Sequence, residues 1–559
     1  MQPVYALRTV AFVVLAAAIA VAAVVAMGTD RERFDSKVKP RAVGYTVTPS
    51  AAVAGAPVVA AVPPEVARNW NAWPLANGDY SNTRTARGSP IDSSNVARLR
   101  IAWEKRLNGA SKWGAAASGP LIADGVVYFQ DLLSNVWAID LHTGGTIWEH
   151  RLDQKAFGPN GPAIGWGKVF AQDGRRSLAA FASGTGRLVW LAPLAGPSGQ
   201  EQPVPYGGMV FTGIAAGLDK AESGKVLRTA LLKGGASGYA YGIRQEDGTV
   251  AWQRRTVQEG FWGNPKVNAG AGVWGTPALD PASGATYWST GNPGPAPGTR
   301  FYPNAASRPG ANLFSNSLLA LDGDTGRQRW YYQALPHDLF HHDLQNAPIL
   351  VRAGGRELVI ASGKMGVVYA VDRSTGALVW KRPVGVHRND TLRKLPLQRA
   401  VLVYPGFWGG IEVPGASVGG TLYYQVENLP TPYNATAWNS VDGQSSVENL
   451  EGRTQYDHGT SEIDAIDAAT GRIRWTTHLP TVGFGGATVV NDLVLTATYD
   501  GVLYALRRSD GRVVWTFQAP GGINAWPAVS GDTVVWPVGL GERPVLLALR
   551  LDAPKRGQR

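Results

Sequence analysis

Two adjacent histidines and an aspartate are the residues of this chain best suited to chemistry. They form the run His341-His342-Asp343. A neutral imidazole accepts a proton near neutral pH, so His341 could act as a general base, with Asp343 orienting it or binding a metal. A neutral His341 could instead ligate a transition metal itself. As a further alternative, both histidines could be polar loop residues with no catalytic role. The residues alone leave these alternatives open.

The elements that must position this run come from a phrase repeated along most of the chain. Each copy has a short apolar stretch, then Thr-Gly or Asp-Gly, then a Trp four residues after that Gly. The seven Gly and Trp pairs are Gly144 with Trp148, Gly186 with Trp190, Gly248 with Trp252, Gly326 with Trp330, Gly376 with Trp380, Gly471 with Trp475 and Gly511 with Trp515. An eighth Trp, Trp103, lacks the Thr-Gly. The shortest Trp spacings, 40–45 residues, match one four-stranded propeller blade.

This period predicts an all-β fold, an eight-bladed β-propeller. Asp-Gly pairs such as Asp124-Gly125 and Asp500-Gly501 adopt positive φ with little conformational strain, so we expect hairpin turns there. Each repeat Trp is expected to lie flat between neighbouring sheets and to stabilise the ring. A propeller must also close, because open strand edges aggregate. We expect the last apolar strand, 544–551, to pair with strands from residues 67–107, so that both chain ends build one blade.

The N-terminus predicts a membrane segment. From Thr9 to Thr29 there are 21 residues without a charge, which would span about 31 Å as a helix. We assign 1–29 to a signal anchor or signal peptide, 30–66 to a tether and 67–559 to the propeller. The basic residues after the span favour a cytoplasmic body, but acids are interleaved with them. We expect a protein of the cell membrane with its propeller on the periplasmic or extracellular side, or one secreted after signal cleavage.

Charge and cysteine content narrow the possible partners. The net charge is +11, and its densest clusters flank the apolar segment or end the chain, where lipid contact is commoner than nucleic-acid binding. No nucleic-acid motif is present, so no nucleic-acid partner is predicted. The chain has no cysteine, which excludes disulfides, Cys-based zinc sites and a Cys-x-x-Cys-His haem. Any electron leaving this protein needs a separate acceptor.

Several further motifs, together with the repeat phrase, carry a family resemblance. They are Trp274-Gly275-Thr276-Pro277, Ser289-Thr290-Gly291-Asn292-Pro293, Arg308-Pro309-Gly310-Ala311-Asn312-Leu313, Pro336-His337-Asp338 and Lys364 with Val368-Tyr369-Ala370-Val371-Asp372. In this order they resemble the pyrroloquinoline-quinone-dependent alcohol dehydrogenases, from about residue 67 to the end. The resemblance implies an eight-bladed propeller that holds pyrroloquinoline quinone and calcium or a lanthanide near its axis. It also implies oxidation of an alcohol or sugar by hydride transfer.

The resemblance assigns roles to three residues. Trp274 matches the ring beneath the flat quinone, Asn292 matches an amide ligand of the metal, and Lys364 matches the basic side chain that bonds the quinone carbonyls. An aromatic ring can stack under a planar cofactor, and a cation can balance its negative charge. A hard metal ion prefers oxygen ligands. Without the resemblance, Trp274 could be a core residue and Lys364 a solvated loop residue.

The chain departs from the family at several functional positions. His341 stands where the family has an aspartate as the proposed base. The family's metal-binding Glu has no counterpart in 212–218, where Glu222 could serve only if the loop is rebuilt. An Arg that contacts the cofactor is lost at 159–161, and the adjacent-cysteine pair is absent. Glu412 offers a replacement carboxylate.

These matches and departures lead to one set of predicted site residues and three functions. The predicted metal ligands are Asn292, Asp343 and Glu412, and the predicted catalytic residues are His341 and Asp343. The leading hypothesis is an exported, membrane-tethered quinoprotein dehydrogenase-like protein, acting on a small alcohol or sugar and serving a separate electron acceptor. The alternative is a non-catalytic propeller that acts as a cell-envelope scaffold or binding protein. A third possibility is a hydrolase with a reworked metal site that includes His342.

Overall fold

The computed structural model describes residues 61–108, 113–217, 234–436 and 459–552, together with two short strands, β28 (Trp438–Asn439) and β29 (Gln444–Ser445). The chain divides into two units, Met1–Val58 and Val59–Arg559, and the fold below is that of the second. The apolar run from Thr9 to Thr29 lies outside the described residues. Within the described part of the chain, no helix is both long and apolar enough to cross a membrane.

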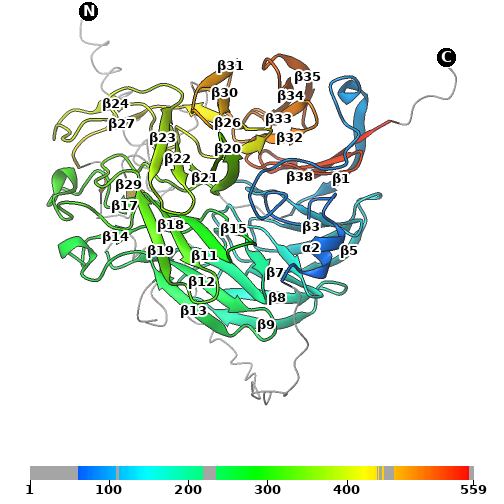
Figure 1. Cartoon of the computed structure of the whole chain (residues 1–559), viewed down its shortest axis with the longest axis horizontal. Helices are drawn as coiled ribbons and strands as arrows, with labels where there is room; N and C mark the ends of the chain where they lie inside the picture. Colours follow the sequence, from blue (N-terminus) through cyan, green and yellow to red (C-terminus); the bar gives the residue numbers. More distant parts are fainter. Residues whose placement is uncertain are drawn as a thin grey trace, which may run out of the picture. The chain divides into compact units, whose positions relative to one another are not determined.

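Among the described residues of the second unit, seven four-stranded antiparallel sheets and one six-stranded sheet form the blades, numbered here 1–8 (Figure 1). Blade 1 holds β2 (Leu121–Ala123), β3 (Val126–Gln130), β4 (Val136–Asp140) and β5 (Thr146–His150). Blade 2 holds β6 (Ala163–Gly165), β7 (Lys168–Gln172), β8 (Ser177–Ala182) and β9 (Leu188–Pro193). Blade 3 holds β10 (Val204–Tyr206), β11 (Met209–Gly217), β12 (Ser237–Arg244) and β13 (Val250–Arg255). Blade 4 holds β15 (Ala278–Asp280), β16 (Ala285–Ser289), β18 (Ser317–Asp322) and β19 (Gln328–Gln333).

The remaining blades follow the same order. Blade 5 holds β20 (Ile349–Ala353), β21 (Arg356–Ala361), β22 (Val367–Asp372) and β23 (Leu378–Pro383). Blade 6 holds β25 (Ala416–Val418), β26 (Thr421–Asn428), β30 (Thr460–Asp467) and β31 (Ile473–Leu479). Blade 7 holds β32 (Thr488–Val490), β33 (Leu493–Ala497), β34 (Val502–Arg507) and β35 (Val513–Gln518). Blade 8 holds β36 (Ala528–Ser530), β37 (Thr533–Val538), β38 (Val545–Leu551) and β1 (Leu99–Arg106).

Short elements connect or extend these sheets. Strands β14 (Ala269–Gly270) and β17 (Pro293–Gly294) extend blade 3, and β24 (Val401–Val403) pairs with β27 (Thr431–Tyr433). The helices are short: α2 (Pro64–Arg68) and three single-turn 3₁₀ helices, η1 (Val96–Arg98), η2 (Phe261–Gly263) and η3 (Pro303–Ala305). The prediction of an all-β, eight-bladed propeller is therefore confirmed.

A Trp packed over a glycine of the next repeat joins seven of the eight blades to the following blade. The Trp252 indole, 8% exposed, lies over Gly326 of the next repeat, where an added Cβ would meet the ring at 2.5 Å. Gly326 has φ +67°, a conformation that glycine adopts without strain. The indole Nε1 also donates a hydrogen bond to the Gly323 carbonyl at 2.8 Å. The same stacking joins Trp103 to Gly144, Trp148 to Gly186, Trp190 to Gly248, Trp330 to Gly376, Trp380 to Gly471 and Trp475 to Gly511. The Thr-Gly and Trp phrase is thus the docking contact between blades.

The two ends of the described chain close the ring in blade 8. Strand β1 pairs antiparallel with β38 from Leu99 opposite Leu551 to Arg106 opposite Val545. Figure 1 shows these first and last strands side by side despite their distance in sequence. The predicted closure is confirmed, because β1 completes blade 8 with β36, β37 and β38.

The segment before β1 ties the blades together at the inner strands. Main-chain hydrogen bonds join Trp73 to Ile122 of β2, Tyr80 to Leu279 of β15, Ser81 to Leu350 of β20, Thr83 to Ser417 of β25, and Arg84 to Val489 of β32. We call residues 73–84 the clasp. The Glu65 carboxylate of α2 also accepts hydrogen bonds from the Trp166 and Gly167 N–H groups. Helix α2 begins at Pro64, inside the range predicted as tether.

Candidate functional site

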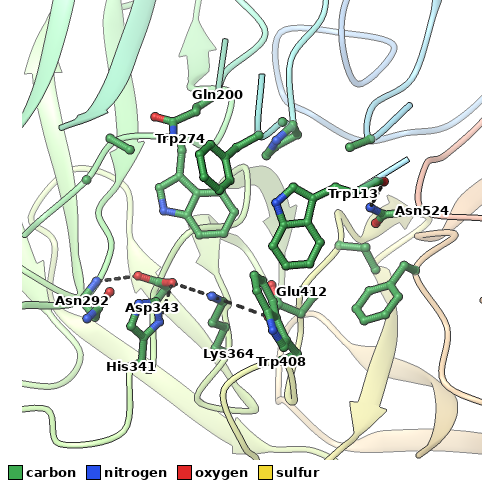
Figure 2. Close-up of a pocket in the computed structure, with 18 of the residues that line it drawn as sticks. Trp113, Gln200, Trp274, Asn292, His341, Asp343, Lys364, Trp408, Glu412 and Asn524 are labelled. Carbon is green, nitrogen blue, oxygen red and sulfur yellow. Dashed lines mark hydrogen bonds and ion pairs between the residues drawn. The ribbon is translucent and has the colours of Figure 1, made fainter. Parts of the chain in front are cut away.

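The six residues singled out in the sequence line one cavity of about 300 Å³. Four come from loops of blades 4 and 5, and Trp274 and Glu412 come from the segments that lead into β15 and β25. Figure 2 shows them around the same hollow. The set is Trp274, Asn292, His341, Asp343, Lys364 and Glu412. Propeller topology brings these loops to one place although the residues span 139 positions of sequence, from 274 to 412.

A buried amine between two carboxylates forms the centre of the site. The Lys364 Nζ lies 2.9 Å from Asp343 Oδ2 and 3.7 Å from Glu412 Oε1. The three side chains are only 2%, 3% and 6% exposed. Lys364 is therefore not a solvated loop residue. Its charge compensates two acids that would be costly to bury alone.

Aromatic rings complete the environment of the Lys364 amine. The Nζ lies 5.3 Å from the centroid of Trp274, 5.0 Å from Phe407 and 4.5 Å from Trp408. At these distances the negative faces of the rings attract a cation. The amine is thus held in place by both carboxylates and rings, with little freedom to move.

Asp343 is fixed from two sides. One oxygen accepts the Lys364 contact, and the other accepts a hydrogen bond from the Asn292 N–H at 2.6 Å. Gly291 permits this approach, since an added Cβ there would lie 2.6 Å from Asp343 Oδ1. Burial acts to raise the pKa of Asp343, but the Lys364 charge, His341 and the Asn292 N–H outweigh it and lower the pKa. Asp343 is therefore an anion at neutral pH.

His341 is a neutral imidazole beside this anion. Burial, and after it the Lys364 charge, lowers the pKa of His341 to about 4. The ring packs against Phe407 with centroids 4.1 Å apart, and Nδ1 lies 3.6 Å from Asp343 Oδ2. Since Nδ1 is buried, Nε2 is the nitrogen left for a ligand in the cavity. A neutral ring with a free nitrogen can accept a proton or ligate a metal.

His342 points away from the cavity. Its Nε2 lies 3.0 Å from the Pro405 carbonyl, and its ring packs on Phe340. The metal cluster of the hydrolase hypothesis is not assembled: in the parts of the chain that are described, no group of three or more His, Cys, Asp or Glu side chains could hold a metal. His342 is thus not among the residues that line the cavity.

The three predicted metal ligands are only partly together. Asn292 and Asp343 are in contact, whereas Glu412 faces them across the Lys364 amine (Figure 2). The contact runs from the Asn292 main-chain N–H to Asp343, and the Asn292 side-chain amide donates to the Pro293 carbonyl at 3.0 Å. The second carboxylate lies beside the lysine. Carboxylate and amide oxygens are ligands for hard cations. The roles of these residues stay predictions.

A buried acid lies near the position of the family's missing Glu. Glu201 accepts hydrogen bonds from Thr212 Oγ1 at 2.6 Å and from the Gly213 N–H at 3.2 Å. Burial raises the pKa of Glu201 well above its usual range, so it is a neutral acid in this environment. Glu201 does not line the cavity. Glu222, the other possible replacement, lies outside the described residues.

Sequence reasoning missed most of the cavity wall. Besides Trp274, three Trp residues outside the repeat phrase line it, and the Trp113 and Trp408 rings meet edge to face with centroids 4.9 Å apart. The others that matter are Trp526, Phe484, Gln200 and Asn524. Their signal was present in the sequence, because these Trp residues do not follow a Thr-Gly or Asp-Gly and stand outside the docking repeat. Such a Trp is a candidate for a binding site.

Comparisons with known proteins agree with this geometry. The family model of the glucose/ethanol/alcohol dehydrogenase β-propeller domain matches residues 73–166 and 232–390. The quinoprotein alcohol dehydrogenase PedH of Pseudomonas putida is 29% identical over 509 residues, covering 80% of this chain and 82% of PedH. This chain is a relative of the quinoprotein alcohol dehydrogenases. The resemblance stated from the sequence is confirmed.

Other comparisons extend the relationship. The lanthanide-dependent methanol dehydrogenase of Methylorubrum extorquens is 24% identical over 514 residues, covering 80% of this chain and 83% of that enzyme. The crystal structure of the quinohemoprotein alcohol dehydrogenase from Comamonas testosteroni shares the fold with a TM-score of 0.71 at 22% identity, over 88% of this chain and 83% of that one. A second family model, that of the outer membrane protein assembly factor BamB, matches residues 459–542.

Proposed function

We propose that this protein is an exported, membrane-tethered dehydrogenase that oxidises an alcohol or a sugar. Its cofactors are pyrroloquinoline quinone and calcium or a lanthanide, both in the cavity. One observation carries the proposal: Trp274, Asn292, Lys364 and Asp343, assigned from separate sequence motifs, line the same cavity. Relatives named as quinoprotein alcohol dehydrogenases support it.

The residues present fit a flat anionic cofactor with a cation beside it. Trp274 offers an indole face, and the Lys364 amine lies 5.3 Å from that ring's centroid. The charge of Lys364 is already balanced by Asp343 and Glu412. An anionic cofactor therefore needs additional positive charge, which a hard cation on Asn292 and Asp343 would supply.

His341 is the proposed proton acceptor. When bound, the quinone supplies an electrophilic carbon that accepts a hydride from the alcohol carbon. His341 Nε2 takes the hydroxyl proton, and Asp343 Oδ2, 3.6 Å from Nδ1, stabilises the imidazolium. Because the low pKa makes this imidazole a weak base, we expect it to hold the proton only transiently. The Trp113 and Trp408 rings limit the access of water.

Export and tethering rest on the sequence. The uncharged run from Thr9 to Thr29 is long enough to span a bilayer as a helix. We propose that it anchors the protein to the cell membrane with the propeller on the periplasmic or extracellular side. Because the chain has no cysteine for a covalent haem, electrons pass to a separate acceptor.

A non-catalytic envelope propeller is the second candidate function. The match of residues 459–542 to the BamB family model favours it, as do the missing family carboxylate and arginine. The BamB match spans little more than blade 7 and parts of its neighbours. Such a protein would retain the Trp docking contacts but would bind no quinone.

Titration of the full chain with pyrroloquinoline quinone tests the proposal. We expect metal-dependent, stoichiometric quenching of Trp fluorescence with calcium or a lanthanide present, and its loss in Trp274→Ala. Trp70→Ala is the matched control, because Trp70 is 38% exposed and does not line the cavity. Absence of quenching at every metal concentration would contradict the dehydrogenase proposal and favour the non-catalytic alternative.

A further inference from the structure

A cluster of exposed apolar side chains lies on the long connection between β23 and β25. Val386, Leu392, Leu397 and Leu402 are 46%, 37%, 59% and 38% exposed. Phe301, 68% exposed, lies on a neighbouring loop. Most other large apolar side chains exposed on the described residues stand singly or in pairs on the outermost strands, as Ile147 does on β5 and Leu191 on β9. We call the five clustered residues the rim patch.

Hydrogen bonds join the segments that carry the rim patch. The Asn304 side chain donates to the Leu395 carbonyl at 3.1 Å and accepts from the Leu395 N–H at 2.7 Å, which joins the Phe301 loop to the 392–397 loop. The Asn389 side chain donates to the Leu402 carbonyl at 2.8 Å. Strand β24 also pairs with β27, and the pair lies at the edge of the propeller in Figure 1.

The apolar residues of this connection divide between two faces. Leu395 and Val403 are buried in a cluster with Phe407, the ring that packs on His341. Their neighbours Leu397 and Leu402 point outward. The inner face therefore fixes the segment to the wall of the site, and the core does not need the outer residues. A contiguous exposed apolar patch of this kind marks an interaction surface.

Basic side chains surround the exposed apolar ones. Arg388, Arg393, Lys394 and Arg399 are all exposed, and none makes an ion pair with a described residue. Arg300 is exposed as well and lies over the Phe301 ring at 4.4 Å. The only acid between 386 and 402, Asp390, is paired with His387 at 2.6 Å. The patch therefore carries net positive charge.

We propose that the rim patch rests on an anionic phospholipid surface. The apolar side chains enter the boundary between headgroups and acyl chains, and the arginines and lysine contact the phosphates. The composition favours lipid over a protein partner. Protein interface hot spots are rich in Trp, Tyr and Arg and poor in Leu and Val, and the patch has the arginines but neither aromatic type of that set. The proposal does not depend on the bound cofactor or on the reaction.

The absence of cysteine allows a direct test in the full chain. Leu397→Cys provides a unique thiol for an NBD fluorophore. The labelled protein is mixed with vesicles that contain doxyl-labelled lipid. One set of vesicles is phosphatidylcholine alone, and the other also contains phosphatidylglycerol. We expect an NBD blue shift and doxyl quenching that require phosphatidylglycerol. The double variant Arg393→Glu/Lys394→Glu should reduce the lipid-contacting fraction at least about tenfold.

Leu191→Cys is the matched control. Leu191 is 48% exposed on β9, outside the patch, and should show no quenching. Because both labelled chains carry the same N-terminal segment, membrane attachment through that segment cannot produce a difference between them. Equal quenching at both positions, or none at Leu397→Cys, overturns the proposal. A blue shift that rises with protein concentration but resists doxyl quenching would also overturn it and identify a surface for another protein copy.

Discussion

The ring of blades and the axial cavity use the same kind of residue in opposite ways. In the ring, Trp252 is 8% exposed and its indole is stacked on Gly326 and hydrogen-bonded to Gly323. In the cavity, Trp274 keeps one face open and has the Lys364 amine at 5.3 Å. The ring Trp is fully used for packing, and the cavity Trp has a face left for a ligand. Burial and partners distinguish a structural Trp from a binding Trp, which residue type alone does not.

The charges show the same contrast. In the ring, the described ion pairs are mostly exposed, as between Arg68 and Asp124, and such pairs contribute little stability. In the cavity, Lys364, Asp343 and Glu412 are almost fully buried. Burying an ion pair costs free energy of desolvation, so the pair contributes little net stability. Such buried charges are typical of functional sites.

The same substitution at the two Trp positions gives the largest expected difference. Trp252→Ala should lower the free energy of unfolding by about 4 kcal/mol, because it leaves a cavity against Gly326 and an unpaired Gly323 carbonyl. Trp274→Ala should cost about 1 kcal/mol, since its ring is only partly buried, but should abolish quinone binding. Urea denaturation measures the first effect, and fluorescence titration the second. Equal losses of stability would contradict the contrast.

Two glycines isolate the docking contact from backbone strain. Gly326→Ala should cost about 3 kcal/mol, from positive φ and a Cβ at 2.5 Å from the Trp252 ring. Gly355→Ala should cost about 1 kcal/mol, because Gly355 has φ +75° but an added Cβ meets no atom within 4 Å. The difference in urea midpoints reports the steric demand of Trp docking. If the two variants are equally stable, the stacking is looser than the structure shows.

A buried acid in blade 6 should make the ring pH-dependent. Burial raises the pKa of Asp464 from 3.8 to about 7, so the folded state holds a proton that the unfolded chain has lost. The stability contribution is present below the unfolded pKa and is lost as pH rises towards 7. Wild type should lose about 2 kcal/mol between pH 5 and pH 7 from this group, and Asp464→Asn should not. Urea denaturation of both proteins at the two pH values measures it, and parallel pH profiles would refute it.

A substitution in the cavity should change binding more than stability. His341→Asp places a second carboxylate beside Asn292 and Asp343, and we expect lanthanide affinity to rise about tenfold, or about 1.4 kcal/mol. The free energy of unfolding should change by less than about 1 kcal/mol, because Asp tolerates the φ of +62° found at His341. Terbium luminescence sensitised by the cavity Trp residues measures the affinity. His337→Asp, an exposed substitution outside the cavity, should leave it unchanged.

The fold was predictable from the sequence because its signal is local and repeated. Each Gly and Trp pair lies within five residues, and seven copies fix the blade period and the docking contact. Closure through β1 and β38 followed from the need to pair the last strand. The clasp was not predicted, because residues 73–84 carry no strand pattern and bind through main-chain groups that any residue has.

The site was predictable in membership but not in arrangement. Motifs in sequence order identified Trp274, Asn292, Lys364 and Asp343 as neighbours of one cavity. They did not indicate that Lys364 separates Glu412 from Asp343, or that His342 faces Pro405. Those contacts depend on how the loops of blades 4 and 5 approach the segment that leads into β25, and sequence spacing carries no information on that approach.

The sequence by itself determined the eight-bladed ring, since periodic hydrophobic and glycine signals act over short distances. The residues that line the cavity came from the motifs that carry the family resemblance. Only the tertiary structure decided their chemical states. Burial and the Lys364 charge lower the pKa of His341 to about 4 and keep its ring neutral, while Lys364 and the Asn292 N–H keep Asp343 ionised. The protonation state of a buried group depends on the charges and dipoles packed around it, and those come from distant parts of the chain.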